Sequence, residues 1–93
     1  MKYTLDNLKF PAVAIGIEMI NGEVNFENHT VLFKSRESFN SFLGETEQIV
    51  SDLYGENVKK EVNSYENCVE LYYGDATKGN YEKWHIYSID AQH

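Results

Sequence analysis

Cys68 and His85 are the residue types in this chain that could do nucleophilic chemistry, because a thiol and an imidazole together can form a nucleophile–base pair. We expect the two residues on neighbouring strands, where their side chains could lie close together. Such a site also needs a group that orients the base and donors for an oxyanion, and no pattern in the sequence supplies either. The sequence therefore predicts that the protein is not an enzyme, and an unpaired cysteine is more often a small buried apolar residue.

The sequence also has no motif for a metal site, a phosphate-binding loop or a pair of catalytic carboxylates. His29, His85 and Cys68 lack the spacing of metal ligands. The loop "YGDATKGN" has neither the residue order nor the following helix of a phosphate-binding loop. Carboxylates are abundant, but nothing in the sequence pairs two of them in an apolar pocket. We therefore expect no metal and no cofactor.

A run of carboxylates in one segment, 35–57, is the most unusual feature of the charge distribution. After Arg36 this segment has no Lys or Arg, and its acidic residues are Glu37, Glu45, Glu47, Asp52 and Glu56. At 100° per residue, Glu37, Glu45 and Asp52 fall on one stripe of a helix. A solvated helix face normally mixes both signs, because opposite charges four residues apart stabilise it. Two interpretations stay open: an ordinary solvated face, or a surface that meets Lys and Arg on a partner.

The exposed face of a C-terminal hairpin is the second candidate surface. Glu70, Tyr72, His85 and Tyr87 are expected to cluster there, together with Lys83. Tyrosine is enriched at protein interfaces. The alternative is ordinary cross-strand pairing on a solvated sheet. The predicted partner-binding residues are therefore Glu37, Glu45, Glu47, Asp52, Glu56, Glu70, Tyr72, His85 and Tyr87.

Two strands joined by a tight turn are predicted before the acidic segment. Residues 10–20 alternate large apolar residues with a set that is mostly Ala and Gly, a period of two that indicates a strand. We expect the large set in the core, and the small set lets another backbone, most simply the helix, approach closely. Asn21-Gly22 predicts a type I′ turn. The alternation of the returning strand, 23–33, slips near 27–29 and predicts a bulge there.

The acidic segment is expected to be one long helix. Ser35 or Ser38 caps its start, and Gly55 is placed to end it in a left-handed conformation. Gly44, inside the helix, is destabilising relative to Ala, and a close contact with the sheet would explain it.

A second hairpin with its loop at 74–80 follows. Matching apolar residues pairs Leu71 with Trp84 and Val69 with Ile86, and the same register sets Glu70 opposite His85 and Tyr72 opposite Lys83. Residues 58–67 are ambiguous between a strand and a loop.

These elements predict a single α+β domain over residues 1–93. The expected fold is a two-layer sandwich in the order ββαββ, a four-stranded antiparallel sheet with one long helix on one face. The predicted core consists of Val13, Ile15, Ile17, Val24, Phe26, Phe39, Phe42, Leu43, Val50, Leu53, Val69, Leu71, Trp84 and Ile86.

Composition limits where the protein works and what it binds. The single cysteine excludes an intrachain disulfide, which fits a reducing cytoplasm. No signal peptide is apparent, and no run approaches the roughly 18 apolar residues of a membrane span. The net charge of −7 argues against direct binding to nucleic acid or anionic membrane. It suits a basic protein partner, with the chain itself a monomer or homodimer.

Three stretches together suggest a kind of protein: "MINGEVNF", the acidic "ESFNSFLGETEQIVSDLYGE" and the Tyr-rich "CVELYYGD…YEKWHIYSI". In size and charge the whole chain resembles the small inhibitors that phages and mobile elements carry, such as anti-CRISPR proteins, inhibitors of uracil-DNA glycosylase and anti-restriction DNA mimics. These families share no signature, so the resemblance transfers no binding residue. It implies a stoichiometric protein in the host cytoplasm that occupies the basic channel of a nuclease, with carboxylates standing in for phosphates.

Two alternatives to an inhibitor remain. The first is a small structural or accessory module that self-associates through an exposed edge strand. The second is a small enzyme or ligand binder, which a deep pocket with convergent polar groups would support.

Overall fold

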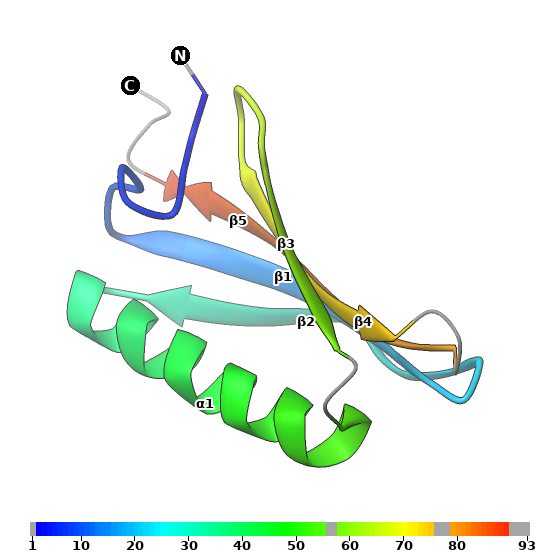
Figure 1. Cartoon of the computed structure of the whole chain (residues 1–93). Coiled ribbons are helices and arrows are strands. Elements are labelled where there is room, and N and C mark those ends of the chain that lie inside the picture. The colour runs from blue at the N-terminus through cyan, green and yellow to red at the C-terminus, as the bar shows by residue number, and fades with distance from the viewer. Residues whose placement is uncertain (1, 56–57, 76–78, 90–93) are drawn as a thin grey trace.

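One helix lies across one face of a five-stranded antiparallel sheet (Figure 1). The computed structural model describes residues 2–55, 58–75 and 79–89. Its elements are β1 (Ala12–Ile20), β2 (Glu23–Phe33), α1 (Arg36–Tyr54), β3 (Lys59–Ser64), β4 (Val69–Asp75) and β5 (Asn80–Ser88). The strand order is β2-β1-β5-β4-β3, so β5 is the middle strand.

The predicted α+β class with a helix on one face of an antiparallel sheet is confirmed, but the prediction of four strands is wrong. Residues in the ambiguous segment 58–67 form β3, which pairs with β4 along the edge of the sheet. Five of its six residues are exposed, so β3 has no buried face that would give the alternation of an amphipathic strand.

The first hairpin has the predicted turn. Asn21 and Gly22 both have positive φ, 52° and 80°, as the two central residues of a type I′ turn require. The β1–β2 register shifts between Gly16 and Glu18, opposite the predicted bulge, and Asn28 has a φ of 55°. The bulge near 27–29 is therefore confirmed.

Helix α1 begins at a capping box. The Ser35 side chain accepts a hydrogen bond from the Ser38 backbone N–H, and the Ser38 side chain accepts one from the Ser35 N–H. Gly55 follows the last turn with a φ of 85° but a ψ of −166°, so its φ is positive without the full left-handed helical conformation. Gly44 is exposed with open space where a side chain would be, and the predicted contact with the sheet is wrong. No described helix is long and apolar enough to cross a membrane.

The second hairpin has the predicted register in all four pairs. Val69 lies opposite Ile86, Leu71 opposite Trp84, Glu70 opposite His85 and Tyr72 opposite Lys83. The apolar pairs point toward α1 and are buried, and the polar pairs point away from it.

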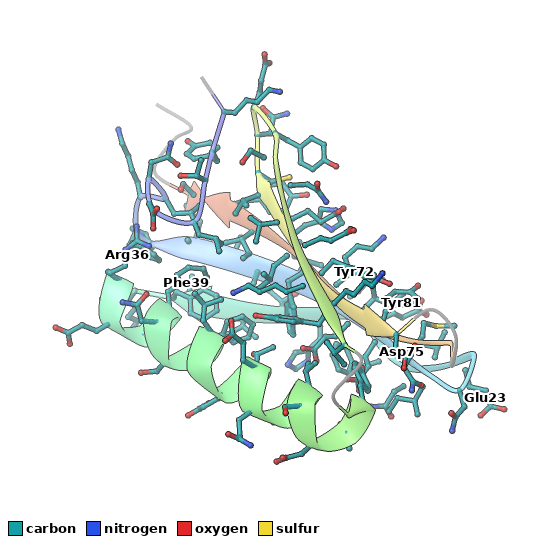
Figure 2. The ribbon with its side chains drawn as sticks, in the orientation of Figure 1. Glu23, Arg36, Phe39, Tyr72, Asp75 and Tyr81 are labelled. Atoms are coloured by element: carbon teal, nitrogen blue, oxygen red, sulfur yellow. The ribbon has the colours of Figure 1, made fainter. Side chains whose placement is uncertain are left out.

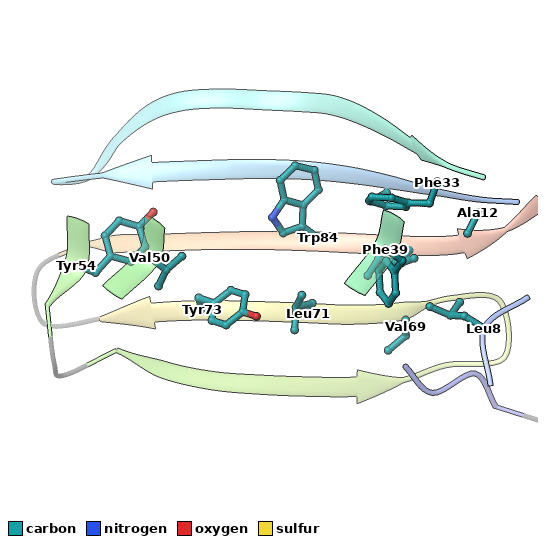
Figure 3. Close-up of a cluster of buried hydrophobic side chains, with 12 residues drawn as sticks. Leu8, Ala12, Phe33, Phe39, Val50, Tyr54, Val69, Leu71, Tyr73 and Trp84 are labelled. Carbon is teal, nitrogen blue, oxygen red and sulfur yellow. The ribbon is translucent and has the colours of Figure 1, made fainter. Parts of the chain in front are cut away.

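The core lies between α1 and the sheet (Figure 3). Phe39 and Val50 from α1 pack with side chains of β4 and β5, and Phe26, Phe42 and Leu43 are partly buried around them. The buried apolar residues of this cluster are Leu8, Ala12, Ala14, Phe33, Phe39, Val50, Tyr54, Val69, Leu71, Tyr73, Trp84 and Ile86.

The large apolar residues of β1 are not in this core, contrary to the prediction. Ala12, Ala14 and Gly16 face α1 instead, and a Cβ at Gly16 would lie only 2.5 Å from ring atoms of Trp84. The indole lies across the strand at this point, so the part of β1 around Gly16 has room only for small residues on the face toward the helix; the larger Glu18 and Ile20 follow it along the strand. Five residues predicted in the core therefore lie outside it. Val13, Ile15 and Ile17 are on the outward face of β1, and Val24 and Leu53 are exposed to solvent.

The N-terminal segment is tied to the start of α1 by Arg36. Its guanidinium donates hydrogen bonds to the backbone carbonyls of Leu5, Asp6 and Leu8, at 2.6, 3.0 and 3.0 Å. It also lies over the Phe10 ring, 4.8 Å from the centroid. A cation at a helix N-terminus is unfavourable to the helix dipole, and these contacts offset that cost.

Replacing Phe39 by Ala should lower the free energy of unfolding by about 3–5 kcal/mol, because the ring is fully buried and its loss leaves a cavity. Leu53→Ala is the matched control on the same helix, where the side chain is 58% exposed, and it should change stability by about 0.5 kcal/mol. Urea unfolding followed by circular dichroism measures both. Equal losses in the two variants would mean that α1 does not face the sheet as described.

Candidate functional site

The solvent face of α1 carries the predicted acidic stripe. Glu37, Glu45 and Asp52 are all exposed, and among the described residues none of them makes an ion pair. Asp52 accepts a hydrogen bond from Gln48 Nε2 at 3.1 Å, which leaves its charge uncompensated. The last turn of the helix contains no basic residue. These carboxylates therefore form a row of negative charge on a rigid element; we call Glu37, Glu45 and Asp52 the acidic row.

Glu47 has a different environment from the acidic row. Its Oε2 accepts hydrogen bonds from Lys60 Nζ at 2.6 Å and from the Tyr73 hydroxyl at 3.0 Å. The hydrogen bond from Lys60 is the main cause of a pKa of Glu47 below its usual value. Glu47 therefore joins α1 to β3 and β4. Glu56, the fifth predicted acidic residue, lies outside the described residues.

The outward face of the second hairpin brings together the other predicted residues. His85 Nε2 lies 3.0 Å from Glu70 Oε2, and Asn63 Nδ2 donates to Glu70 Oε1 at 3.0 Å. Tyr72 stacks on Tyr81 with ring centroids 5.8 Å apart, and both side chains are labelled in Figure 2. Glu70 thus has partners within its own sheet, so its charge is less available to a basic protein.

Cys68 and His85 have separate partners in the described structure. Cys68 is buried, and burial raises the pKa of its thiol, so the nucleophilic thiolate is disfavoured at neutral pH. The neighbouring side chain that affects this thiol by hydrogen bonding is Tyr87, whose own pKa is raised chiefly by burial.

The two predicted surfaces lie on opposite sides of the molecule. The acidic row is on the side of α1 that faces solvent, whereas Glu70, Tyr72, His85 and Tyr87 are on the sheet face that α1 does not cover. A single flat interface cannot contain both sets. The structure therefore divides the predicted residues that it describes between two candidate sites.

A buried pair of carboxylates was missed by sequence reasoning. Glu18 on β1 lies directly opposite Glu82 on β5, and both are buried beneath α1. The Tyr54 hydroxyl donates to Glu18 Oε2 at 2.6 Å and Asn25 Nδ2 donates to Glu18 Oε1 at 2.7 Å. Glu82 Oε2 has no hydrogen-bond partner among the described residues. The signal was not visible because the pair depends on register between strands 64 residues apart.

The environment of Glu82 favours its protonated form. Burial, followed by the nearby charge of Glu18, raises the pKa of Glu82 to about 7, although the Trp84 indole opposes the shift. Two adjacent buried carboxylates resemble an acid–base pair. A cleft of about 250 Å³ lies at the end of α1, and its polar residues include Glu47, Lys60 and Tyr73. Neither Glu18 nor Glu82 lines this cleft. The pair therefore belongs to the interior of the fold. No cluster of three or more His, Cys, Asp or Glu in the described ranges could hold a metal ion.

Comparison with known proteins identifies no relative of this chain. No protein-family model, no curated protein and no solved structure matches it.

Replacing Glu82 by Gln should raise stability most at alkaline pH. A carboxyl whose pKa is about 7 when folded and 4.5 ordinarily holds its proton more tightly in the folded state, so it destabilises the fold as pH rises from about 4.5 to about 7. At pH 8 the variant should be about 2–3 kcal/mol more stable than wild type, and near pH 4 the difference should vanish. Urea unfolding across this range measures it.

The control is Glu27→Gln, which removes one exposed carboxylate from β2. Comparing variants at each pH cancels the contribution of Glu47, whose lowered pKa gives the opposite dependence. A constant difference between Glu82→Gln and wild type from pH 4 to 8 would contradict the assigned environment of Glu82.

Proposed function

We propose that this chain is a non-catalytic binding protein whose acidic row occupies a basic surface of a protein partner, and that the partner is a nucleic-acid-processing enzyme such as a CRISPR–Cas nuclease. The observation that carries the proposal is the row of Glu37, Glu45 and Asp52 on the exposed face of α1, with no compensating cation among the described residues. The chain would act as a stoichiometric inhibitor in the cytoplasm.

The spacing of the acidic row suits a surface that binds a nucleic-acid backbone. At 1.5 Å per residue, Glu37 and Glu45 are about 12 Å apart along the helix and Glu45 and Asp52 about 10 Å. One strand of DNA carries a phosphate about every 3.4 Å along the axis, so each interval is close to three phosphates. Lysines and arginines arranged for phosphates can therefore meet these carboxylates without rearrangement.

Two cations that lie on or against α1 are engaged by other groups. Arg36 is turned onto the carbonyls of the N-terminal segment, and Lys60 is paired with Glu47. Neither neutralises the acidic row. The acidic row therefore keeps its negative charge in the free protein, where it can attract a basic partner.

Self-association through an edge strand, the alternative function, finds less support. The edge strand β2 is bulged, with Asn28 at positive φ. The other edge, β3, is six residues long and begins with Lys59 and Lys60. Bulges, short length and lysines are devices that prevent strand pairing between molecules.

Replacing the acidic row, Glu37→Gln, Glu45→Gln and Asp52→Asn together, should weaken binding to a Cas nuclease at least tenfold at low salt, mainly through slower association. Wild-type affinity should fall steeply as salt rises, because exposed charges are screened within about 8 Å at physiological ionic strength. Surface plasmon resonance at two salt concentrations measures both effects. Glu47 is left intact because it holds Lys60.

The matched control removes the same number of charges elsewhere, Glu23→Gln, Glu27→Gln and Glu66→Gln, all exposed and off the helix. It should bind like wild type apart from a small uniform loss. If the two triple variants bind equally well at low salt, the acidic row is an ordinary solvated surface.

A further inference from the structure

The sheet face that α1 leaves uncovered is apolar along its centre. The outward residues of β1 are Val13, Ile15, Ile17 and Met19. The stripe continues on β2, where Leu32 lies opposite Val13 and Val24 opposite Met19. Ile15, Val24 and Leu32 are 38%, 53% and 54% exposed. An antiparallel sheet with one face in water normally places polar residues there, so this stripe indicates a surface that another protein covers.

The charge on this face differs from that of the chain as a whole. The register places four formally charged side chains on the uncovered face: Lys59 and Lys83, and Glu61 and Glu70. They sum to zero, whereas the chain carries −7. The negative excess therefore lies elsewhere. On β2, β1 and β5 the register places one formally charged residue on this face, Lys83, so no group of carboxylates opposes the approach of a second copy there.

We propose that the uncovered sheet face packs against the same face of a second copy of the chain, with β1 on β1 about a twofold axis. An axis along β1 places β5 of each copy over β2 of the other. Residues at the same height then meet, because Tyr87, Val13 and Leu32 share one level of the sheet and Tyr81, Met19 and Val24 share another. Tyr87 and Tyr81 of one copy therefore face Leu32 and Val24 of its partner.

The polar residues of the face also match in this arrangement. His85 and Thr30 share the level of Ile15, so His85 of one copy lies over Thr30 of the other. Ile15 itself meets Ile15 on the axis. A self-complementary surface of this kind is what a twofold interface requires, since every contact occurs twice.

The face is smaller than a standard protein interface, so the dimer that it supports is a weak one. A nine-residue strand is about 30 Å long and three strands are about 15 Å wide, which gives several hundred Å² on each copy. Standard interfaces bury about 800 Å² on each partner, so we expect a dissociation constant in about the micromolar range. Sheet-on-sheet packing leaves both α1 helices on the outside, and the dimer does not depend on the proposed function.

Sedimentation equilibrium from about 1 µM to about 500 µM tests the dimer, a range that brackets the expected dissociation constant. Wild type should change from one to two copies across this range. Ile15→Glu should raise the dissociation constant at least tenfold, whereas Leu53→Glu, which adds the same charge to an exposed apolar position on α1, should behave like wild type. Wild type that stays monomeric at every concentration, or Ile15→Glu that dimerises like wild type, would overturn the proposal.

Mixing two variants tests the contact of β1 with itself. Ile15→Glu and Ile15→Lys should each be monomeric at about 100 µM, and their mixture should form a heterodimer because opposite charges then meet on the axis. Circular dichroism establishes that each variant is folded. If Ile15→Glu does not fold, Val24→Glu, at a more exposed position of the same face, replaces it in the sedimentation experiment and should also raise the dissociation constant at least tenfold. A mixture that stays monomeric would rule out the β1-on-β1 arrangement.

Discussion

Contact between the Trp84 indole and the backbone of β1 at Gly16 is the constraint on which the other features depend. The indole lies where a Cβ of residue 16 would be, and Phe26, His29 and Phe42 surround the ring with centroids 5.8, 6.1 and 5.0 Å away. Trp84 therefore fills the space between α1 and the centre of the sheet. Because it does, β1 contributes only small residues to the core from Ala12 to Gly16, and Val13, Ile15 and Ile17 occupy the opposite face. The apolar uncovered face follows directly from this packing.

The sequence predicted the parts of the fold that depend on local patterns. The Asn21-Gly22 turn, the Ser35 cap and the register of β4 with β5 follow from turn chemistry, capping and the matching of neighbouring apolar residues. The orientation of β1 did not follow, because hydrophobicity assigns Val13 and Ile15 to the core and the size limit set by Trp84 is a tertiary effect. Strand β3 was ambiguous because an exposed edge strand lacks a buried face.

In the candidate sites, too, features set by local sequence patterns were predicted and features set by tertiary contacts were not. Exposure of the acidic row follows from helical periodicity alone, and the structure agrees. The ion pair of Glu47 with Lys60 could not be predicted while β3 was undefined. The buried Glu18 and Glu82 pair depends on pairing of β1 with β5, which are distant in sequence. Charged residues at the surface can thus be predicted from the sequence, whereas predicting charged residues in the interior requires the register of strands that are distant in sequence.

The central place of β5 has a consequence for the order in which the protein folds during synthesis. β1 leaves the ribosome before β5, its second neighbour in the sheet, whose residues emerge about 70 positions later. Until then the β1–β2 hairpin and α1 lack Trp84, and the apolar side chains on both faces of β1 are exposed to solvent. The sheet therefore closes only after residue 88 has emerged, and until then the exposed apolar surface and unpaired strand edge of β1 can associate with other chains.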